Sequence, residues 1–199
     1  MPTMKDVCNQ GLGKIGASRV NNLTPPISVL EVKCAGEYQQ WKTSELKKRR
    51  WVFATAFTML EALPDQVPPD PQWRTYKFNK PGDLLRPVRP ANCTWVMRGE
   101  FFYDRYNTIQ LEYIRTVEDS EMTDPCFIDV LAARVAMECV ELATQSPGKR
   151  VNAIGTYKDA LDTASRLNAF VLDPHQLQGD EMGYTWDIGR LNPDLSGSL

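Results

Sequence analysis

Apolar residues recur every three to four positions near the start of the chain, and this spacing predicts two amphipathic helices. The first covers residues 5–16 and ends at Gly16, a residue suited to the position just after a helix. The second covers about 27–46, with Ser28 and Glu31 in a capping-box pattern. Four basic residues follow at 47–50, where the negative end of the helix dipole favours them.

The next stretch, 51–63, is ambiguous between helix and extended chain, and its small and apolar residues lean towards helix. The proline-rich segment 64–71 cannot form a helix interior, so it marks the clearest boundary in the chain. Beyond it the pattern indicates strands. Residues 84–88 form a short strand, and Pro87 within it and Pro90 after it favour a sheet edge. Residues 94–97 and 100–103 flank Arg98-Gly99 as a hairpin. Residues 108–117 alternate most regularly and form the longest expected strand.

Two more helices are expected after an acidic link at 118–124. One covers about 125–145, capped by Thr123 or Asp124, and the other covers about 149–171. The inward face of the first is expected to hold Phe127, Leu131, Val135, Cys139 and Leu142. That of the second is expected to hold Ile154, Tyr157, Leu161, Ala164 and either Leu167 or Asn168.

This order predicts a mainly α fold with a β insertion, an α+β class, in which helices from both ends of the chain pack together as a four-helix bundle core. Residues 1–63 and 124–172 would form the bundle, and 64–123 a small antiparallel β unit between the second and third helices. Residues 173–199 would form an extended C-terminal tail with apolar anchors but no clear periodicity.

The amino-acid composition excludes few classes of function. The chain has 199 residues, 42% hydrophobic and 24% charged, with a formal net charge of -2. This balance is ordinary for a globular protein and does not by itself argue for nucleic acid or a membrane surface. No apolar run reaches the roughly 18 residues that span a bilayer, so we expect no membrane anchor, and the first residues carry no secretory signal. We therefore expect synthesis in the cytoplasm of the producing cell.

The residues that usually carry chemistry are sparse. Five cysteines stand far apart without a C-x-x-C pair, which favours free, buried thiols over a metal site. The single histidine, His175, lies in the tail and is interpreted as a loop residue. The glycines at 11, 13 and 16 match a dinucleotide-binding spacing, but no strand precedes them, so close helix packing explains them better. We expect no cofactor, no metal and no catalytic residue.

Carboxylates cluster at Glu118, Asp119, Glu121 and Asp124, just before a helix, where capping and solvation explain them. An acid pair across a cleft, such as a glycosidase needs, would require a further member such as Glu100 or Glu112, and this alternative stays open.

Charge is distributed unevenly along the chain. Residues 72–98 carry six basic residues against one acidic, and 175–199 carry four acidic against one basic. Solubility alone would explain this distribution. The alternative is a contact surface, in which Arg86, Arg89 and Arg98 face DNA or a partner protein. In the tail, Tyr184 and Trp186, followed by Arg190, either fold back on their own domain or anchor in a partner, since aromatic residues and Arg are common interface anchors.

Several segments, taken in order, resemble the head-to-tail adaptor proteins of short-tailed bacteriophages, also called tail tubular protein A. The likeness covers about residues 4–192. In the first half it rests on Asp6-Val-Cys8-Asn9, Leu12-Gly13, Gly16, Cys34, Tyr38, Trp41 and Trp51-Val-Phe-Ala54. In the second half it rests on Tyr76-Lys-Phe78, Pro81-Gly-Asp83-Leu84-Leu85, 109–114, Asp124-Pro-Cys-Phe127, 131–136 and 184–190.

The resemblance implies a structural virion protein in the virus neck. Twelve copies would form a ring between the portal protein and the tail nozzle protein, and viral DNA would pass through it. The resemblance also implies a helical bundle with a β insertion. Tyr184, Trp186 and Arg190 would then contact a neighbour or the portal, and Arg86, Arg89 and Arg98 the nozzle side or the channel.

Two other functions are kept as alternatives. A peptidoglycan hydrolase acting during genome delivery would need two carboxylates facing a cleft, and some members of the resembled family have been credited with that activity. No motif for it stands in this sequence, so we do not carry it over. A non-specific DNA-binding module would use the basic stretch, and would bind duplex DNA in a strongly salt-dependent way.

Overall fold

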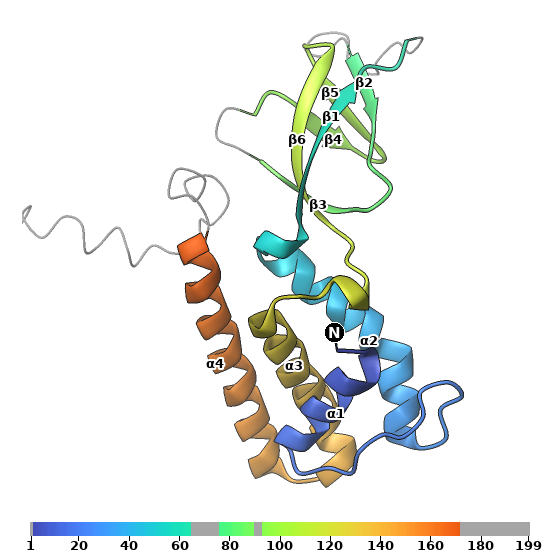
Figure 1. Cartoon of the computed structure of the whole chain (residues 1–199), viewed down its shortest axis with the longest axis vertical. Helices are drawn as coiled ribbons and strands as arrows, with labels where there is room; N and C mark the ends of the chain where they lie inside the picture. The colour runs from blue at the N-terminus through green and yellow to red at the C-terminus, as the bar shows by residue number, and fades with distance from the viewer. Residues whose placement is uncertain (1, 65–75, 90–92, 172–199) are drawn as a thin grey trace, which may run out of the picture.

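The computed structural model describes residues 2–64, 76–89 and 93–171. Within these ranges, four α helices lie at one end of the molecule and six strands at the other (Figure 1). The helices are α1 (Met4–Lys14), α2 (Val29–Lys48), α3 (Pro125–Thr144) and α4 (Pro147–Val171). The strands are β1 (Thr55–Glu61), β2 (Tyr76–Asn79), β3 (Leu84–Val88), β4 (Val96–Arg98), β5 (Phe101–Asp104) and β6 (Thr108–Arg115).

The helix boundaries follow from local capping. Thr3 caps α1 and Ser28 caps α2, each in a capping box with the acidic residue three positions later. Gly16 follows α1 with a φ of 67°, a left-handed conformation that glycine adopts without steric cost. The expected caps at Ser28 and Gly16 are therefore confirmed.

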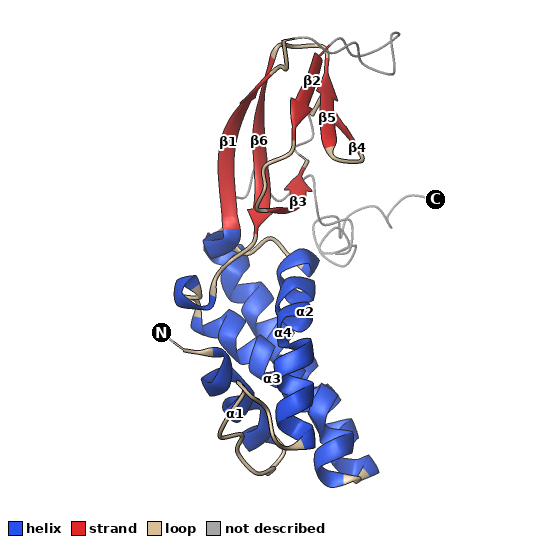
Figure 2. Ribbon diagram, turned by 90° about the vertical axis from the view of Figure 1, so that its right-hand side faces the viewer, coloured by secondary structure: helices blue, strands red, loops and turns tan. Residues whose placement is uncertain are grey.

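The third helix is the centre of the helical part. The Asp124 side chain caps it by accepting a hydrogen bond from the Cys126 N–H at 2.8 Å, and Pro125 occupies its first turn. Nine of its residues are buried, because α1, α2 and α4 all pack against it. Gln145, with a φ of 49°, ends α3, and α4 begins two residues later. The chain therefore reverses direction in a tight turn, as Figure 2 shows.

The six strands form two three-stranded antiparallel sheets, ordered β1-β6-β3 and β2-β5-β4. Side chains from the facing sides of these sheets make a second, smaller core, which includes Phe78, Trp95, Phe102 and Leu111. Trp95 and Phe102 meet edge to face, with ring centroids 5.1 Å apart. The hairpin of β4 and β5 turns at Gly99, whose φ is 59°. The expected hairpin is confirmed, as is the edge position of residues 84–88.

The larger core lies between the helices and extends into the lower end of the sheet β1-β6-β3. Trp51 and Phe127 make an edge contact at 4.9 Å within it, and Val88 and Ile114 reach it from the strands. The helical part and the strand part are therefore joined through buried side chains as well as through the chain itself.

Three expectations need correction. Residues 51–63 do not lean helical: a short 3-10 turn η1 (Val52–Ala54) leads into β1, which pairs along its whole length with β6. The stretch 55–61, which the sequence assigned to the helical part, therefore belongs to a sheet. Leu142 is half-exposed rather than inward. Of the two residues that the sequence left open on α4, Asn168 bonds to the Arg50 carbonyl, while Leu167 is half-exposed.

Candidate interaction surfaces and the residues that hold them

A buried carboxylate, Glu45, fastens three helices together. Its side chain is 0% exposed. The Tyr157 hydroxyl of α4 donates to it at 3.0 Å, and the Lys48 ammonium of its own helix lies at 2.7 Å. Arg134 of α3 approaches to 3.8 Å. A buried charge needs such partners, so this cluster fixes how α2, α3 and α4 meet and leaves no open carboxylate for chemistry.

A second charged contact joins the two parts of the molecule. Arg50, just after α2, forms an ion pair with Glu112 of β6, and both side chains are largely buried. Asn168 of α4 donates to the Arg50 carbonyl and accepts from the Val52 N–H at 3.2 Å. The end of α4, the end of α2 and the base of the sheet therefore meet at one place.

The acidic cluster is occupied by structural contacts. Asp119 accepts from Lys42 at 2.6 Å, and the Lys42 side chain is only 5% exposed. Glu121 pairs with Arg115 at 3.1 Å and caps the short turn η2 (Asp119–Glu121) by accepting from the Glu118 N–H. These bonds lower the pKa of Glu121, the backbone bond contributing most. Asp124 caps α3, so the capping interpretation is confirmed for Asp124 and Glu121.

The two further carboxylates considered for an acid pair are also engaged. Glu112 pairs with Arg50, and the mostly exposed Glu100 pairs with Lys80. Five of the carboxylates that the hydrolase alternative would use are thus held by a cation or a backbone N–H: Asp119, Glu121, Asp124, Glu112 and Glu100.

The three arginines singled out from the sequence lie in the strand part but on different sheets. Arg86 is on β3 and half-buried, and Arg89 follows that strand. The Arg89 guanidinium lies over the Trp95 ring, 5.4 Å from its centroid. Arg98 ends β4 in the other sheet and is exposed. Tyr184, Trp186, Arg190 and His175 lie outside the described residues.

The glycines of the first helix have different roles. A Cβ on Gly11 would stand 2.5 Å from the Ala132 carbonyl oxygen and 2.8 Å from Val135, so this glycine lets α1 approach α3 closely. A Cβ on Gly13 would meet no other atom within 4 Å. Close helix packing, as expected from the sequence, is confirmed at Gly11.

All five cysteines are free. Cys8, Cys34 and Cys139 are fully buried where α1, α2 and α3 meet, and the Cys34 and Cys139 sulfurs are 4.0 Å apart. Hydrogen bonding to Cys34, together with burial, raises the pKa of Cys8 and of Cys139, so both stay protonated thiols. The interpretation of these three as small buried hydrophobic residues is confirmed. Across the described ranges, no group of three or more His, Cys, Asp or Glu side chains is placed to hold a metal ion.

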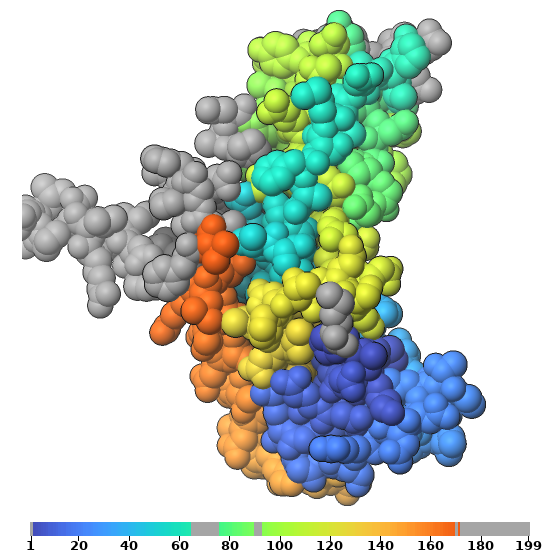
Figure 3. All heavy atoms as spheres, in the orientation of Figure 1, coloured from blue at the N-terminus to red at the C-terminus, as the bar shows by residue number. Residues whose placement is uncertain are grey.

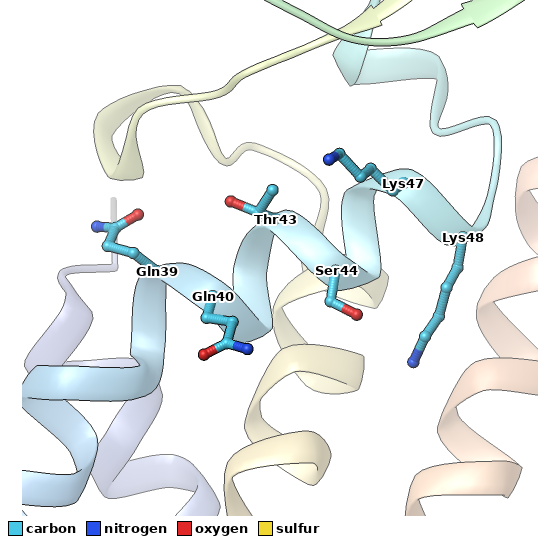
Figure 4. A pocket seen from close by; sticks show the side chains of 6 residues that line it. All are labelled: Gln39, Gln40, Thr43, Ser44, Lys47 and Lys48. Carbon is cyan, nitrogen blue, oxygen red and sulfur yellow. The ribbon is translucent and has the colours of Figure 1, made fainter.

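The outer face of α2 carries a shallow depression of about 620 Å³ (Figure 4). Six polar residues line it in two rows along the helix: Gln39, Gln40, Thr43, Ser44, Lys47 and Lys48. The lining holds two cations and amide and hydroxyl groups, without a carboxylate or an imidazole. Such a surface suits a polar or acidic partner.

Large apolar side chains are exposed at both ends of the molecule. At the start of α2, Ile27, Val29 and Val32 are 83%, 70% and 55% exposed. On the outer face of β1, Phe57 and Met59 are 71% and 62% exposed. Sequence reasoning missed both sets, although the alternation of Phe57, Met59 and Glu61 could have indicated one face of a strand.

In the portion of the chain that the structure describes, no helix has the length and apolar character to cross a membrane. Comparison with models of known protein families and with curated proteins finds no match to this chain.

Proposed function

We propose that this chain is a structural virion protein, one subunit of a dodecameric head-to-tail adaptor ring between a portal and a tail nozzle. The proposal starts from the ordered resemblance of its segments to the adaptors of short-tailed bacteriophages. In this arrangement the four helices form a bundle that builds the ring wall, and viral DNA passes through the centre. The protein would be made in the host cytoplasm and work in the virion neck.

The observation that carries the proposal is the position of the exposed apolar side chains. Ile27, Val29 and Val32 lie by the start of α2, far from the sheets, while Phe57 and Met59 lie on β1 at the other end (Figure 1). Two separate apolar surfaces on one elongated subunit suit a protein that contacts several others. Different surfaces meeting head to tail are the geometry that closes into a ring.

The charged residues support a non-enzymatic role. Asp119, Glu121, Glu112 and Glu100 pair with cations, Asp124 caps α3, and the fully buried Glu45 fastens the helices to one another. Joining proteins requires a rigid subunit, and this is what such contacts provide. The hydrolase alternative is favoured by no feature of the described residues.

In the ring, the strand part would face the nozzle or the channel with Arg86, Arg89 and Arg98. The segment with Tyr184, Trp186 and Arg190 would reach a neighbouring subunit or the portal. Ending the chain after Asp173 tests this assignment: the shortened protein is expected to lose binding to portal rings. If it still joins them normally, the assignment of the C-terminal segment is wrong.

The apolar surface at the start of α2, formed by Ile27, Val29 and Val32, is tested separately. We expect Val29→Ser with Val32→Ser to reduce co-sedimentation with portal rings, because polar side chains weaken an apolar contact. Leu142→Ser, at a half-exposed position on α3, serves as the matched control and should co-sediment as the unaltered protein does. Equal binding by both variants would remove this surface from the proposal.

A further inference from the structure

Among the strands that the structure describes, β1 has one open edge. It lies at the end of the sheet order β1-β6-β3, so β6 pairs with one side of it only. Near its end, the Leu63 N–H donates to the Lys77 carbonyl at 2.9 Å, and β2 approaches there. Within the described residues, the stretch 55–59 has no strand beside its outer edge. Backbone groups along such an edge are ready to pair with another extended segment.

The outer face of this strand is also apolar. Phe57 and Met59 point away from the sheet core, opposite Glu112 and Gln110 of β6. An exposed edge with large apolar side chains is a surface that natural proteins usually cover.

The chain beyond α4 starts close to the beginning of β1. Asn168 ties the last turns of α4 to the Val52 N–H, three residues before β1 begins. In the space-filling view, the orange end of α4 lies beside the teal residues that lead into β1 (Figure 3). A further 28 residues, 172–199, follow from this point.

Residues 173–199 as a whole show no clear periodicity, but the short stretch 182–188 within them has the pattern of a strand. Its apolar residues alternate with small or polar ones over seven positions: Met182, Tyr184, Trp186 and Ile188 are separated by Gly183, Thr185 and Asp187. A period of two is the signature of a strand with one apolar face. Its length equals the seven residues of β1.

We propose that residues 182–188 add as a strand to the open edge of β1 in the same chain, before the subunit assembles. Their apolar side chains then lie beside Phe57 and Met59, and their main-chain groups form hydrogen bonds with the N–H and C=O groups along the outer edge of β1. The ten residues 172–181 can span up to about 33 Å, while β1 is about 23 Å long. They are therefore long enough to connect the end of α4 to a strand placed along β1. Because residues 182–188 are tethered to β1, their effective concentration at its edge exceeds that of the same segment from a second copy at ordinary protein concentrations. Pairing within one chain is therefore favoured.

The inference goes beyond the adaptor proposal and is tested on the free subunit, without a portal. Its failure therefore leaves the ring proposal untouched, and failure to bind a portal leaves strand addition untouched. If both hold, assembly releases Trp186 from β1 for use at an interface.

Amide hydrogen exchange provides the test. In the full chain, the outer-edge amides of residues 55–59 should be protected. In a chain ending at Asp173 they should exchange at least about tenfold faster, while α3 amides stay unchanged and report an intact fold. The double variant Thr185→Pro with Trp186→Pro should behave like the shortened chain, because proline cannot donate to a ladder. The matched control, Ser196→Pro with Gly197→Pro, should behave like the full chain.

Two results would overturn the inference. Equal exchange of residues 55–59 in the full and shortened chains would show that the segment does not cover β1. Protection that disappears on dilution would show that the segment of a second copy, rather than the same chain, occupies the edge.

Discussion

The Tyr157 hydroxyl donates to both carboxylate oxygens of Glu45 at 3.0 Å, which ties α4 to a residue of α2 that has no exposed surface. Replacing Glu45 by Ala leaves Lys48, Tyr157 and Arg134 without their shared acceptor. We expect a loss of about 3 kcal/mol in the free energy of unfolding, since removing one partner of a buried charge cluster is costly. Urea denaturation measures it.

Two variants calibrate this expectation. Tyr157→Phe removes only the donated hydrogen bond and should cost about 1 kcal/mol. Glu37→Ala, which removes a half-exposed carboxylate 3.6 Å from Lys33, should change stability very little. If Glu45→Ala and Glu37→Ala had the same effect, the cluster would not hold the helices together.

Gly11 and Gly13 stand two residues apart on α1 and should respond oppositely to alanine. Gly11→Ala forces a Cβ against the Ala132 carbonyl of α3 and is expected to destabilise by about 2 kcal/mol. Gly13→Ala meets open space and should stabilise by up to about 1 kcal/mol, because alanine favours a helix. Thermal unfolding of both variants checks the pair, and a destabilising Gly13→Ala would contradict the packing described.

Stability should fall in acid because of Glu31. Its carboxylate accepts backbone N–H bonds from Ser28, Asn22, Ile27 and Asn21, which lower its pKa from the ordinary 4.5 to about 2. A carboxylate with a lowered pKa stabilises the fold fully above its unfolded pKa, and this contribution is lost as the pH falls from about 4.5 towards 2.

Glu31→Gln is the variant that isolates this effect. Its urea midpoint should be lower than that of the unaltered protein at pH 7, and the difference should shrink as the pH falls towards 2. A difference that stays constant from pH 7 to pH 2.5 would show that the Glu31 bonds do not depend on its charge.

The hydrolase alternative has a direct test. Zymography with purified protein on peptidoglycan should show no clearing, because Asp119 and Glu121 pair with Lys42 and Arg115. Clearing that disappears in the triple variant Glu118→Ala, Asp119→Ala, Glu121→Ala would contradict a purely structural role.

Local capping and turn chemistry were the most predictable parts of the fold. Ser28 with Glu31, Asp124 with Pro125, and Gly16 each satisfy backbone groups within a few residues, so the sequence alone determines where these helices begin and end. The β4–β5 hairpin at Gly99 was predictable for the same reason.

The stretch after α2 was not predictable from local pattern. Met59 and Leu60 have spacings that fit a helix, but pairing with β6, some fifty residues away, makes this segment a strand. The buried positions of Lys42, Glu45 and Arg50 were missed for a related reason. From the local sequence alone, charged residues near a helix end are expected to face solvent. In the fold, distant residues such as Asp119, Tyr157 and Glu112 contact them and bury them.

The candidate surfaces were foreseen only in part. The sequence drew attention to Arg86, Arg89 and Arg98, but the strands place them on two sheets rather than in one patch. The exposed Phe57 and Met59 emerge only from the edge position of β1, which depends on the pairing of distant strands.

The most direct test of the central claim is negative-stain electron microscopy of the purified protein mixed with portal rings from the phage to which the proposal assigns it. The adaptor proposal predicts an added ring of twelve subunits at one end of each portal. Portal rings that look the same with and without the protein, at concentrations where the protein is folded and in excess, would contradict it.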